Sequence, residues 1–349
     1  MNDTELLRQV SLPLLDWYRE NRRDLPWRRT SDPYPIWVSE IMLQQTRVAA
    51  VIGYYERFLG AFPHIADLAA ADDDALMKQW QGLGYYSRAR NLKRAAIEIV
   101  KNHGGRFPDT YEKILSLPGI GEYTAGAIAS IAFGLPVPAV DGNVLRVTAR
   151  LTGDEADITL PATKKRVREA LLQAMPQDAP GEFNQAMMEL GATMCLPNGK
   201  PDCANCPLRE FCAAHRDDLT DALPVTPKKK PRSVEERVVY LVFFNEKVAV
   251  RRRPERGLLS GLFEFPSRMK VEPAPNIPGR CVPGPAAKHI FTHREWRMES
   301  RVIHADSDVL PDGWIWADAV ELNSIYAIPS AFSGFMEEVF RNIRGSAGQ

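Results

Sequence analysis

The sequence predicts a multidomain protein, with an all-α domain followed by a smaller α+β domain. Three observations support this prediction. Before residue 224, long segments show helical periodicity interrupted by turns rich in Gly and Pro. Residues 224–233 contain three prolines and four basic residues, a composition typical of an extended linker. Beyond it, runs of β-branched and aromatic residues indicate strands. We therefore expect domains at residues 1–223 and 234–349, joined by the linker 224–233.

The composition narrows the class of protein. The chain has 349 residues, of which 45% are hydrophobic and 25% charged, as in ordinary soluble globular proteins. Its 44 basic and 44 acidic residues cancel, so bulk charge does not indicate a nucleic-acid partner, and any such partner must bind local patches. No apolar run is long enough to cross a bilayer, and residues 1–5 carry acid rather than the base of a targeting peptide. We expect a cytoplasmic protein with reduced thiols and no membrane partner.

The helical half contains one charged residue in an apolar setting. Helical periodicity is clear at residues 6–19, 75–81, 88–101 and 125–132, and residues 35–46 also look helical. Within that last segment Glu40 is the only charge. A solvated Glu is the ordinary reading of an isolated residue, but burial here would raise its pKa and suit it to general-acid catalysis. Gln44 is expected one helical turn beyond Glu40 on the same face of the helix, where its amide could hydrogen-bond the edge of a nucleobase.

Residues 114–132 predict two helices joined by a tight turn. Pro118 ends the first helix, and Gly119-Ile120-Gly121 opens the second. Glycines allow close approach of a partner, and the unpaired N–H groups at a helix start can bind phosphate. An ordinary helical hairpin is the alternative reading.

A second carboxylate, Asp141, follows the apolar run 137–140 and precedes a predicted helix. Its simplest role is an N-cap. A carboxylate can also stabilise positive charge that develops during a reaction, and capping does not exclude such a role.

Four of the five cysteines lie within residues 195–212, with seven, two and five residues between them. Two disulfides, a zinc site and an iron–sulfur cluster are all possible with such a group. The fifth, Cys281, is expected to be buried as a small apolar residue. The four that form the candidate metal site are Cys195, Cys203, Cys206 and Cys212.

In the C-terminal half, strands are predicted at residues 238–244, at 248–250 after a polar turn, and at 296–302 with period two. Residues 333–343 indicate a final helix. These elements define the α+β domain.

The string Leu-Pro-Gly-Ile-Gly-x-x-Thr-Ala at residues 117–125 resembles the helix–hairpin–helix of base-excision DNA glycosylases. Residues 37–46, 82–91, 140–144 and 183–188 resemble the adenine glycosylases of the MutY type. The resemblance implies a monomer that acts on double-stranded DNA and hydrolyses the N-glycosidic bond of adenine mispaired with 8-oxoguanine or guanine. The adenine would flip out of the duplex, and Gly119 and Gly121 would grip its backbone.

The same resemblance assigns roles to individual residues. Glu40 would protonate N7 of adenine and Asp141 would stabilise the sugar cation, while Tyr123 and Asn143 would orient water and sugar. Arg28 and Gln185 would line the base pocket. Five further residues would contact the DNA around the mispair, namely Gln44, Gln45, Thr46, Leu83 and Tyr85. Of these, Gln45, Leu83 and Tyr85 resemble the wedge that fills the gap beside the base opposite adenine.

Two further implications concern the reaction and the cysteines. Tyr123 stands where endonuclease III-type relatives carry the lysine that forms a Schiff base, so a monofunctional glycosylase is expected. Relatives also carry a four-cysteine [4Fe–4S] cluster after the hairpin, with a first gap of six residues rather than seven. The cluster would act as a scaffold, not as a redox catalyst.

The C-terminal half has a resemblance of its own. Residues 257–266 resemble the strand that enters a Nudix fold, but residues 267–276 lack the Glu-rich helix that binds magnesium, so we expect no pyrophosphohydrolase activity. Phe291-Thr292-His293 resembles a Phe-Ser-His loop that probes 8-oxoguanine.

Some alternatives remain at this stage. A glycosylase for pyrimidine lesions or thymine mismatches is one, and a DNA-binding module without glycosylase chemistry is another. Five arginines lie near Trp27 and could simply form a solvated helix end, but the hairpin makes phosphate contact the favoured role for some of them; they are Arg19, Arg22, Arg23, Arg28 and Arg29.

Overall fold

A computed structural model describes residues 2–227 and 231–343, so residues 228–230 of the predicted linker lie outside the described part. Its contacts divide the chain into two compact units. The first comprises the described residues of Met1–Ala70 and Arg90–Lys228, and the second those of Ala71–Ala89 and Lys229–Gln349. The segment Ala71–Ala89, which the sequence pattern grouped with the helical domain, therefore belongs to the unit that holds the sheet.

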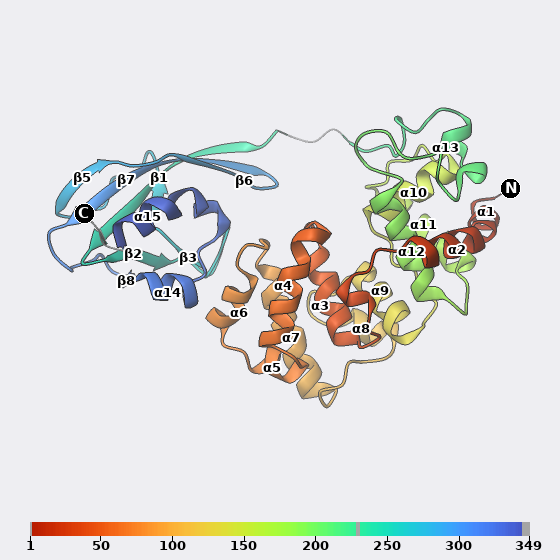
Figure 1. The fold of residues 1–349 in the computed structure, drawn as a ribbon, viewed down its shortest axis with the longest axis horizontal. Coiled ribbons are helices and arrows are strands. Elements are labelled where there is room, and N and C mark those ends of the chain that lie inside the picture. The colour runs from red at the N-terminus through yellow and green to blue at the C-terminus, as the bar shows by residue number, and fades with distance from the viewer. Residues whose placement is uncertain (1, 228–230, 344–349) are drawn as a thin grey trace. The chain divides into compact units, whose positions relative to one another are not determined.

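The first unit is helical throughout its described residues (Figure 1). Its core is formed where α2 and α12 pack together and where α3 and α12 each contact α9. The helices and 3₁₀ turns, including α7, which starts in the second unit, are α1 (Asp3–Gln9), α2 (Ser11–Asn21), η1 (Pro26–Arg28), α3 (Pro33–Leu43), α4 (Val48–Ala61), α5 (Ile65–Ala70), α7 (Ser87–Asn102), α8 (Tyr111–Leu115), α9 (Glu122–Phe133), α10 (Gly142–Thr152), α11 (Pro161–Ala174), α12 (Pro180–Thr193), η2 (Arg209–Phe211) and α13 (Ala213–Arg216).

Two helix predictions were wrong in their extent. The helix predicted over residues 6–19 is two helices, α1 and α2, which meet at Val10. Pro13 explains the break, because it is tolerated in the first turn of a new helix but not inside a continuing one. The helix predicted over residues 35–46 ends at Leu43, and Gln45 has φ +61°. Gln44 is the C-cap of α3 with φ −58°, so it still lies about one turn beyond Glu40, although the helix stops there.

The second unit contains one sheet with strand order β3-β2-β1-β7-β5, in which β4 pairs with β1, β6 with β7 and β8 with β2. Strands β1 and β7 are parallel, and the other pairs are antiparallel. The hairpin between β1 and β2 turns at Asn245-Glu246, both with positive φ, as a two-residue turn of this kind requires. The strands are β1 (Ser233–Phe244), β2 (Lys247–Arg252), β3 (Phe263–Glu264), β4 (Ser267–Met269), β5 (Gly279–Pro283), β6 (Ala287–Ile290), β7 (Arg294–Ala305) and β8 (Trp314–Ala317).

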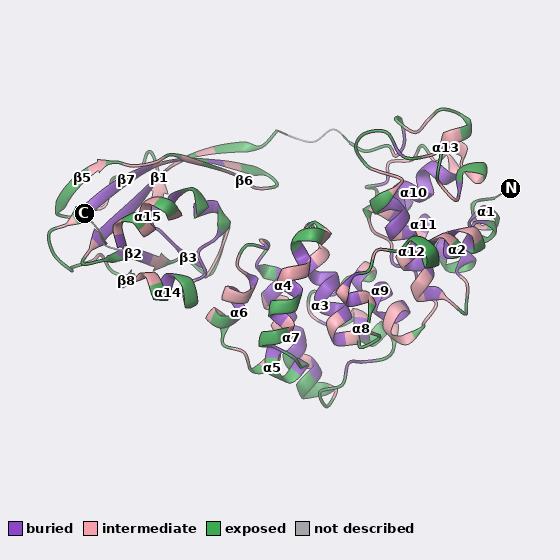
Figure 2. Ribbon diagram, viewed as in Figure 1, coloured by how far each residue is buried: buried purple, intermediate pink, exposed green. Residues whose placement is uncertain are grey.

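Successive side chains of β1 point to opposite faces of the sheet, and both faces are buried. Val239, Leu241 and Phe243 pack against Phe332 and Val339, which come from η3 (Ser330–Phe335) and α15 (Met336–Ile343). The intervening residues of β1 join a smaller apolar cluster on the opposite face. Figure 2 accordingly shows β1 and β7 buried along much of their length.

Two short helices complete the unit, α6 (Asp73–Trp80) and α14 (Ala319–Ser324). The Lys78 ammonium donates to the backbone carbonyls of Leu322 and Tyr326 at 2.8 and 3.2 Å. A cation beside carbonyls at the end of α14 is favourable, because those groups lack helical partners. Among the described residues between β3 and β5 there is strand β4 and no helix. None of the described helices is long and apolar enough to cross a membrane.

Candidate active site

Glu40 is buried in α3. Asp32 caps this helix by accepting a hydrogen bond from the Tyr34 N–H at 2.9 Å, and Pro33 occupies the first position, where no N–H is needed. The helix is apolar around its whole circumference, so it packs inside the unit and takes Glu40 with it. Only 5% of Glu40 is exposed, which confirms the predicted burial.

The carboxyl group of Glu40 has a specific partner. The Tyr123 hydroxyl, on α9, donates a hydrogen bond to Glu40 Oε2 at 2.6 Å and lies 3.3 Å from Met188 Sδ of α12. Burial raises the pKa of Glu40 to about 7, and the Asp141 carboxylate adds to the rise, against the hydrogen bond from Tyr123 and the positive charge of Arg28. Near neutral pH Glu40 can thus carry a proton and release it.

Asp141 is the N-cap of α10, as its position in the sequence predicted. Its Oδ1 accepts the Val144 N–H at 2.8 Å and its Oδ2 accepts the Asn143 amide at 2.7 Å. Burial raises the pKa of Asp141, and these hydrogen bonds oppose the rise by stabilising the ionised form. Asn143 is held in turn by Arg146, whose guanidinium donates to Asn143 Oδ1 at 2.8 Å and to the Cys195 carbonyl at 2.8 Å.

The hairpin of α8 and α9 has the predicted tight turn. Gly119 has φ +78°, and a Cβ atom there would lie 2.5 Å from Asn91 Cβ. Gly121 is the N-cap of α9 with φ −100°, and a Cβ atom there would meet nothing within 4 Å. Only Gly119 is required by the local conformation; Gly121 leaves the start of α9 open to a partner.

The residues predicted to line the base pocket are already engaged within the protein. Gln185 Oε1 accepts the Tyr18 hydroxyl at 3.0 Å. Arg28 donates to Glu189 Oε2 at 2.8 Å, and Arg23 donates to both oxygens of the same carboxylate. Although burial opposes it, hydrogen bonds from Arg23 and Arg28 lower the pKa of Glu189 to about 2. The sequence interpretation missed Glu189, although its place one helical turn after Gln185 was a usable signal.

The other N-terminal arginines also have partners. Arg19 pairs with Glu182 at 2.8 Å and Arg29 pairs with Asp24 at 2.5 Å, while Arg22 lies over the Tyr18 ring. These contacts favour intramolecular roles over the predicted phosphate contacts.

Gln44, Gln45 and Thr46 form the turn after α3. The Gln44 amide donates to Thr124 Oγ1 at 3.3 Å, and the Thr46 hydroxyl lies 3.5 Å from the Gln44 carbonyl. Gln45 is exposed with positive φ, which is uncommon for a residue with a side chain.

The remaining substrate residues lie in the second unit. Leu83 is buried, whereas Tyr85 is 48% exposed and also has positive φ. The Tyr85 and Thr292 hydroxyl oxygens are 2.5 Å apart. Phe291 packs edge-on against Trp296 with 4.9 Å between ring centroids, and His293 is exposed. The structure thus brings Tyr85 and the loop 291–293 together.

The four clustered cysteines line one pocket. Cys195, Cys203, Cys206 and Cys212 surround it together with Arg150 and Met194, among others. All four are free thiols, so the disulfide alternative is not realised. The Arg150 guanidinium donates to Cys195 Sγ at 3.3 Å. Burial and the neighbouring thiols raise the pKa of Cys206 to about 12, so ionising all four requires a bound cation.

The spacing of these thiols bears on which metal fits. Four thiolates on one zinc ion would have sulfur atoms roughly 3.8 Å apart, since Zn–S bonds are about 2.3 Å long. A four-iron cluster takes one thiolate per iron, and the four cysteines that line this pocket supply that number of ligands.

Cys281 was predicted wrongly. It is exposed, because β5 lies at the sheet edge and pairs only with β7.

Comparisons with known proteins agree with this geometry. Residues 38–177 match the HhH-GPD superfamily of base-excision DNA repair proteins, and residues 238–338 match the NUDIX domain. The adenine DNA glycosylase of Mus musculus is 35% identical over 94% of this chain and 76% of its own length. The Homo sapiens adenine DNA glycosylase is 33% identical over 95% of this chain and 73% of its own length. The adenine DNA glycosylase of Buchnera aphidicola subsp. Acyrthosiphon pisum is 36% identical over 75% of this chain and 75% of its own length.

Solved structures agree for the helical half. A thermostable thymine-DNA glycosylase superposes with a TM-score of 0.57 at 31% identity, covering 62% of this chain and all of its own. Endonuclease III in a trapped complex with DNA superposes with a TM-score of 0.53 at 22% identity, covering 63% of this chain and all of its own. At this level of identity the likeness is one of fold. The relatives that match nearly the whole chain decide between these names: the chain belongs to the adenine DNA glycosylases, a family of base-excision DNA repair enzymes.

Proposed function

We propose that this protein hydrolyses the N-glycosidic bond of adenine mispaired with 8-oxoguanine or guanine in double-stranded DNA. It would act as a monomeric, monofunctional glycosylase in the cytoplasm. The observation that carries the proposal is the buried Glu40 carboxyl, hydrogen-bonded to Tyr123 and electrostatically coupled to Asp141. Two carboxyl groups with different surroundings are what acid-assisted glycosidic cleavage needs.

The reaction follows from this arrangement. Tyr123 donates to Oε2 of Glu40, which leaves Oε1 to carry the acidic proton and deliver it to N7 of a flipped adenine. The C1′–N9 bond then breaks, its electron pair leaves with adenine, and the Asp141 carboxylate stabilises the cationic sugar. Water adds to C1′ and gives a proton to the Glu40 carboxylate, which restores the acid. Asn143 and Arg146 keep Asp141 in place throughout.

The absence of an amine at position 123 supports monofunctional chemistry. A lyase step needs a Schiff base between a lysine amine and C1′, and a phenol cannot form one. We therefore expect abasic sites rather than strand breaks as the direct product.

The second unit supports the proposed choice of mispair. Thr292 and Tyr85 share a hydrogen bond, so the loop 291–293 and the wedge residue form one surface. We propose that this surface, within the predicted domain 234–349 and the segment 71–89, contacts the base opposite adenine.

We also propose that Cys195, Cys203, Cys206 and Cys212 hold a [4Fe–4S] cluster. When bound, the cluster supplies a rigid link between the end of α12 and the segment 203–212. Cys195, Cys206 and Cys212 pack against buried residues of the helical core and would hold the cluster beside it.

One assay tests the proposed function. Purified protein is incubated with duplexes that contain adenine opposite 8-oxoguanine, adenine opposite guanine, or thymine opposite guanine, and abasic sites are then cleaved with alkali. We expect alkali-dependent breaks at adenine in the first two duplexes. Breaks at thymine, or an absence of breaks at adenine, would overturn the proposal, and breaks without alkali would overturn its monofunctional part.

A further inference from the structure

The loop between β6 and β7 is held by its backbone while one hydroxyl projects from it. The Phe291 N–H donates to the Arg294 carbonyl at 2.8 Å. The His293 carbonyl accepts from both the N–H and the hydroxyl of Ser233, at 3.1 and 3.3 Å. These contacts fix both ends of the loop and leave the exposed Thr292 side chain at its tip.

The loop also rests on a buried aromatic ring. Trp296 is 1% exposed, and Phe291 packs edge-on against it. A displaced Trp296 would therefore shift the first residue of the loop, and with it Thr292.

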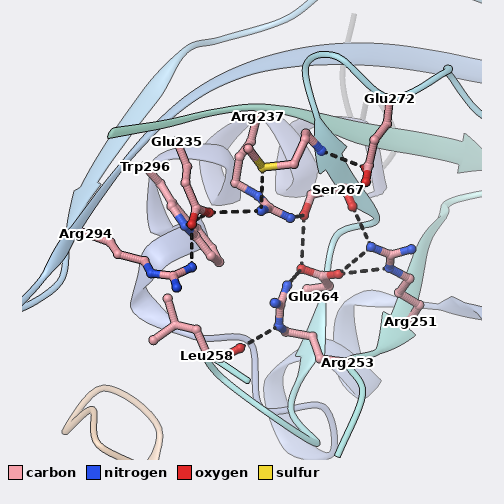
Figure 3. A network of polar contacts seen from close by, with 11 residues as sticks. Glu235, Arg237, Arg251, Arg253, Leu258, Glu264, Ser267, Glu272, Arg294 and Trp296 are labelled. Carbon is pink, nitrogen blue, oxygen red and sulfur yellow. Dashed lines mark hydrogen bonds and ion pairs between the residues drawn. The ribbon is translucent and has the colours of Figure 1, made fainter. Parts of the chain in front are cut away.

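Glu235 binds the first and third residues of β7, the strand that follows the loop. In the parallel pair of β1 and β7, Glu235 is in register with Trp296, so the two side chains lie on the same face. Glu235 accepts the Trp296 indole N–H at 2.8 Å and the Arg294 guanidinium at 2.5 Å, with Arg237 at 3.4 Å (Figure 3). The Glu235 side chain is 17% exposed and that of Arg237 is 11% exposed, whereas Arg294 is 54% exposed, so water screens the Arg294 ion pair more than the other contacts.

A second carboxylate supports the same ring from behind. Arg237 and Arg253 lie over Trp296, with 4.5 and 5.5 Å from guanidinium carbon to ring centroid. The buried Glu264 pairs with Arg253 and accepts from Arg251 at 2.9 Å (Figure 3). Both carboxylates are therefore linked to Trp296, Glu235 directly and Glu264 through Arg253.

We infer that Glu235 is a positioning residue for recognition of the base opposite adenine. It fixes Trp296 and Arg294, and through them the position at which the Thr292 hydroxyl meets the opposite base. This inference rests on the proposed function, in which Thr292 contacts that base. Glu235 itself contacts no DNA in this account.

The test compares excision of adenine opposite 8-oxoguanine with excision opposite guanine. Single-turnover rates on both duplexes are measured with the same preparation, so that the ratio is independent of the active fraction. The variants are Glu235→Ala, Glu235→Gln, Thr292→Ala and the double variant Glu235→Ala/Thr292→Ala. Glu236→Ala is the matched control, because Glu236 is the next residue of β1 and is exposed.

We expect Glu235→Ala to lower the ratio about as far as Thr292→Ala, and the double variant to lower it no more than about twofold further, as for residues that act together. Glu235→Gln keeps an acceptor for the Trp296 N–H but loses the ion pair with Arg294. Its ratio should therefore lie between those of the wild type and Glu235→Ala. Glu236→Ala should match the wild type. Hydrogen exchange should increase at residues 289–296 and stay unchanged at 238–250.

The outcomes separate the two ideas. A wild-type protein that excises adenine at equal rates opposite 8-oxoguanine and guanine overturns this inference and leaves the proposed glycosylase function standing, whereas no excision on either duplex overturns the proposed function itself. A preference that Thr292→Ala abolishes but Glu235→Ala leaves intact overturns only the role of Glu235. Faster exchange throughout the sheet in both Glu235 variants would reduce Glu235 to a general stabiliser and also overturn its positioning role.

Discussion

At Glu40, burial and hydrogen bonding act in opposite directions on one proton. The two effects leave the pKa of this carboxyl group close to 7, where it can donate and recover a proton in each cycle.

We expect Glu40→Gln to bind the mispaired duplex with unchanged affinity and to have a single-turnover excision rate at least about 100-fold lower than the wild type. Gel-shift titration and alkaline cleavage measure the two quantities. Glu169→Gln, at an exposed position on α11, is the isosteric control. Retained turnover in Glu40→Gln would remove it from the general-acid role.

Tyr123 should set the pH range of the reaction. The acid form of Glu40 is required, so the rate should fall as pH rises through the pKa of Glu40 near 7. The Tyr123 hydroxyl stabilises the carboxylate and lowers that pKa. Tyr123→Phe removes this hydrogen bond, so the pKa should rise and the alkaline limb of the pH–rate profile should move to higher pH. Single-turnover rates between about pH 5 and 9 test this; a shift to lower pH would contradict it.

The residue-scale chemistry was partly visible in the sequence. Glu40 stands alone among apolar residues, and Asp141 follows an apolar run at a helix start, so both positions were predictable from local patterns. The ion pairs of Glu189 with Arg23 and Arg28 were not, because they join residues about 160 positions apart in the chain.

Among the elements, α10 combines a structural cap with a chemical group, and the two can be separated. Asp141→Ser keeps an oxygen acceptor for the Val144 N–H, whereas Asp141→Ala removes it. We expect the free energy of unfolding in urea to be about 1 kcal/mol lower for Asp141→Ala than for Asp141→Ser, because an N-cap usually contributes about that much stability. Both should lose excision, because neither carries a carboxylate. Excision retained by Asp141→Ser would show that capping, and not charge, is what Asp141 supplies.

The α8–α9 hairpin offers a matched pair of glycines. Gly119→Ala should destabilise the protein by more than about 1 kcal/mol, because it combines positive φ with a Cβ atom 2.5 Å from Asn91. Gly121→Ala has neither problem and should fold normally. If the turn binds the phosphate backbone, Gly121→Ala will weaken DNA affinity without changing the melting temperature. Wild-type affinity in Gly121→Ala would place the backbone contact elsewhere.

Element boundaries were predictable only where the sequence marks them. Strands β1, β2 and β7 were located because runs of β-branched and aromatic residues or period-two alternation mark them, whereas the shorter strands β4, β5, β6 and β8 were not predicted. The end of α3 at Leu43 was missed because Gln44-Gln45-Thr46 contains neither Gly nor Pro. The positive φ of Gln45 is therefore set by tertiary packing, which a local pattern does not report.

For the whole molecule, the cysteine pocket makes a compositional prediction. Protein purified without oxygen should contain about four irons and four sulfides per chain, with a broad visible absorption band and no zinc. Cys206→Ser should reduce the iron content, while Cys281→Ser, at the exposed sheet edge, should leave it unchanged. A colourless protein loaded with zinc would contradict the cluster.

The division of the chain into units was the least predictable feature. Periodicity identified α6 as a helix, but it reports which residues of a helix are apolar and not which domain they pack against. Several partners of α6 are backbone carbonyls, such as those of Leu322 and Tyr326, and a carbonyl leaves no trace in a sequence pattern.

Because the chain enters the second unit twice, a cut in the segment 224–233 does not separate the two bodies of the fold. A fragment that ends at residue 223 would retain α6 but expose Lys78 and Asp74 to water, since Asp74 pairs with Arg252 beyond the cut. The complementary fragment would lack Tyr85, the partner of Thr292. Such a cut therefore divides the proposed recognition surface, because Tyr85 precedes Tyr123 and Asp141 in the chain and Thr292 follows them.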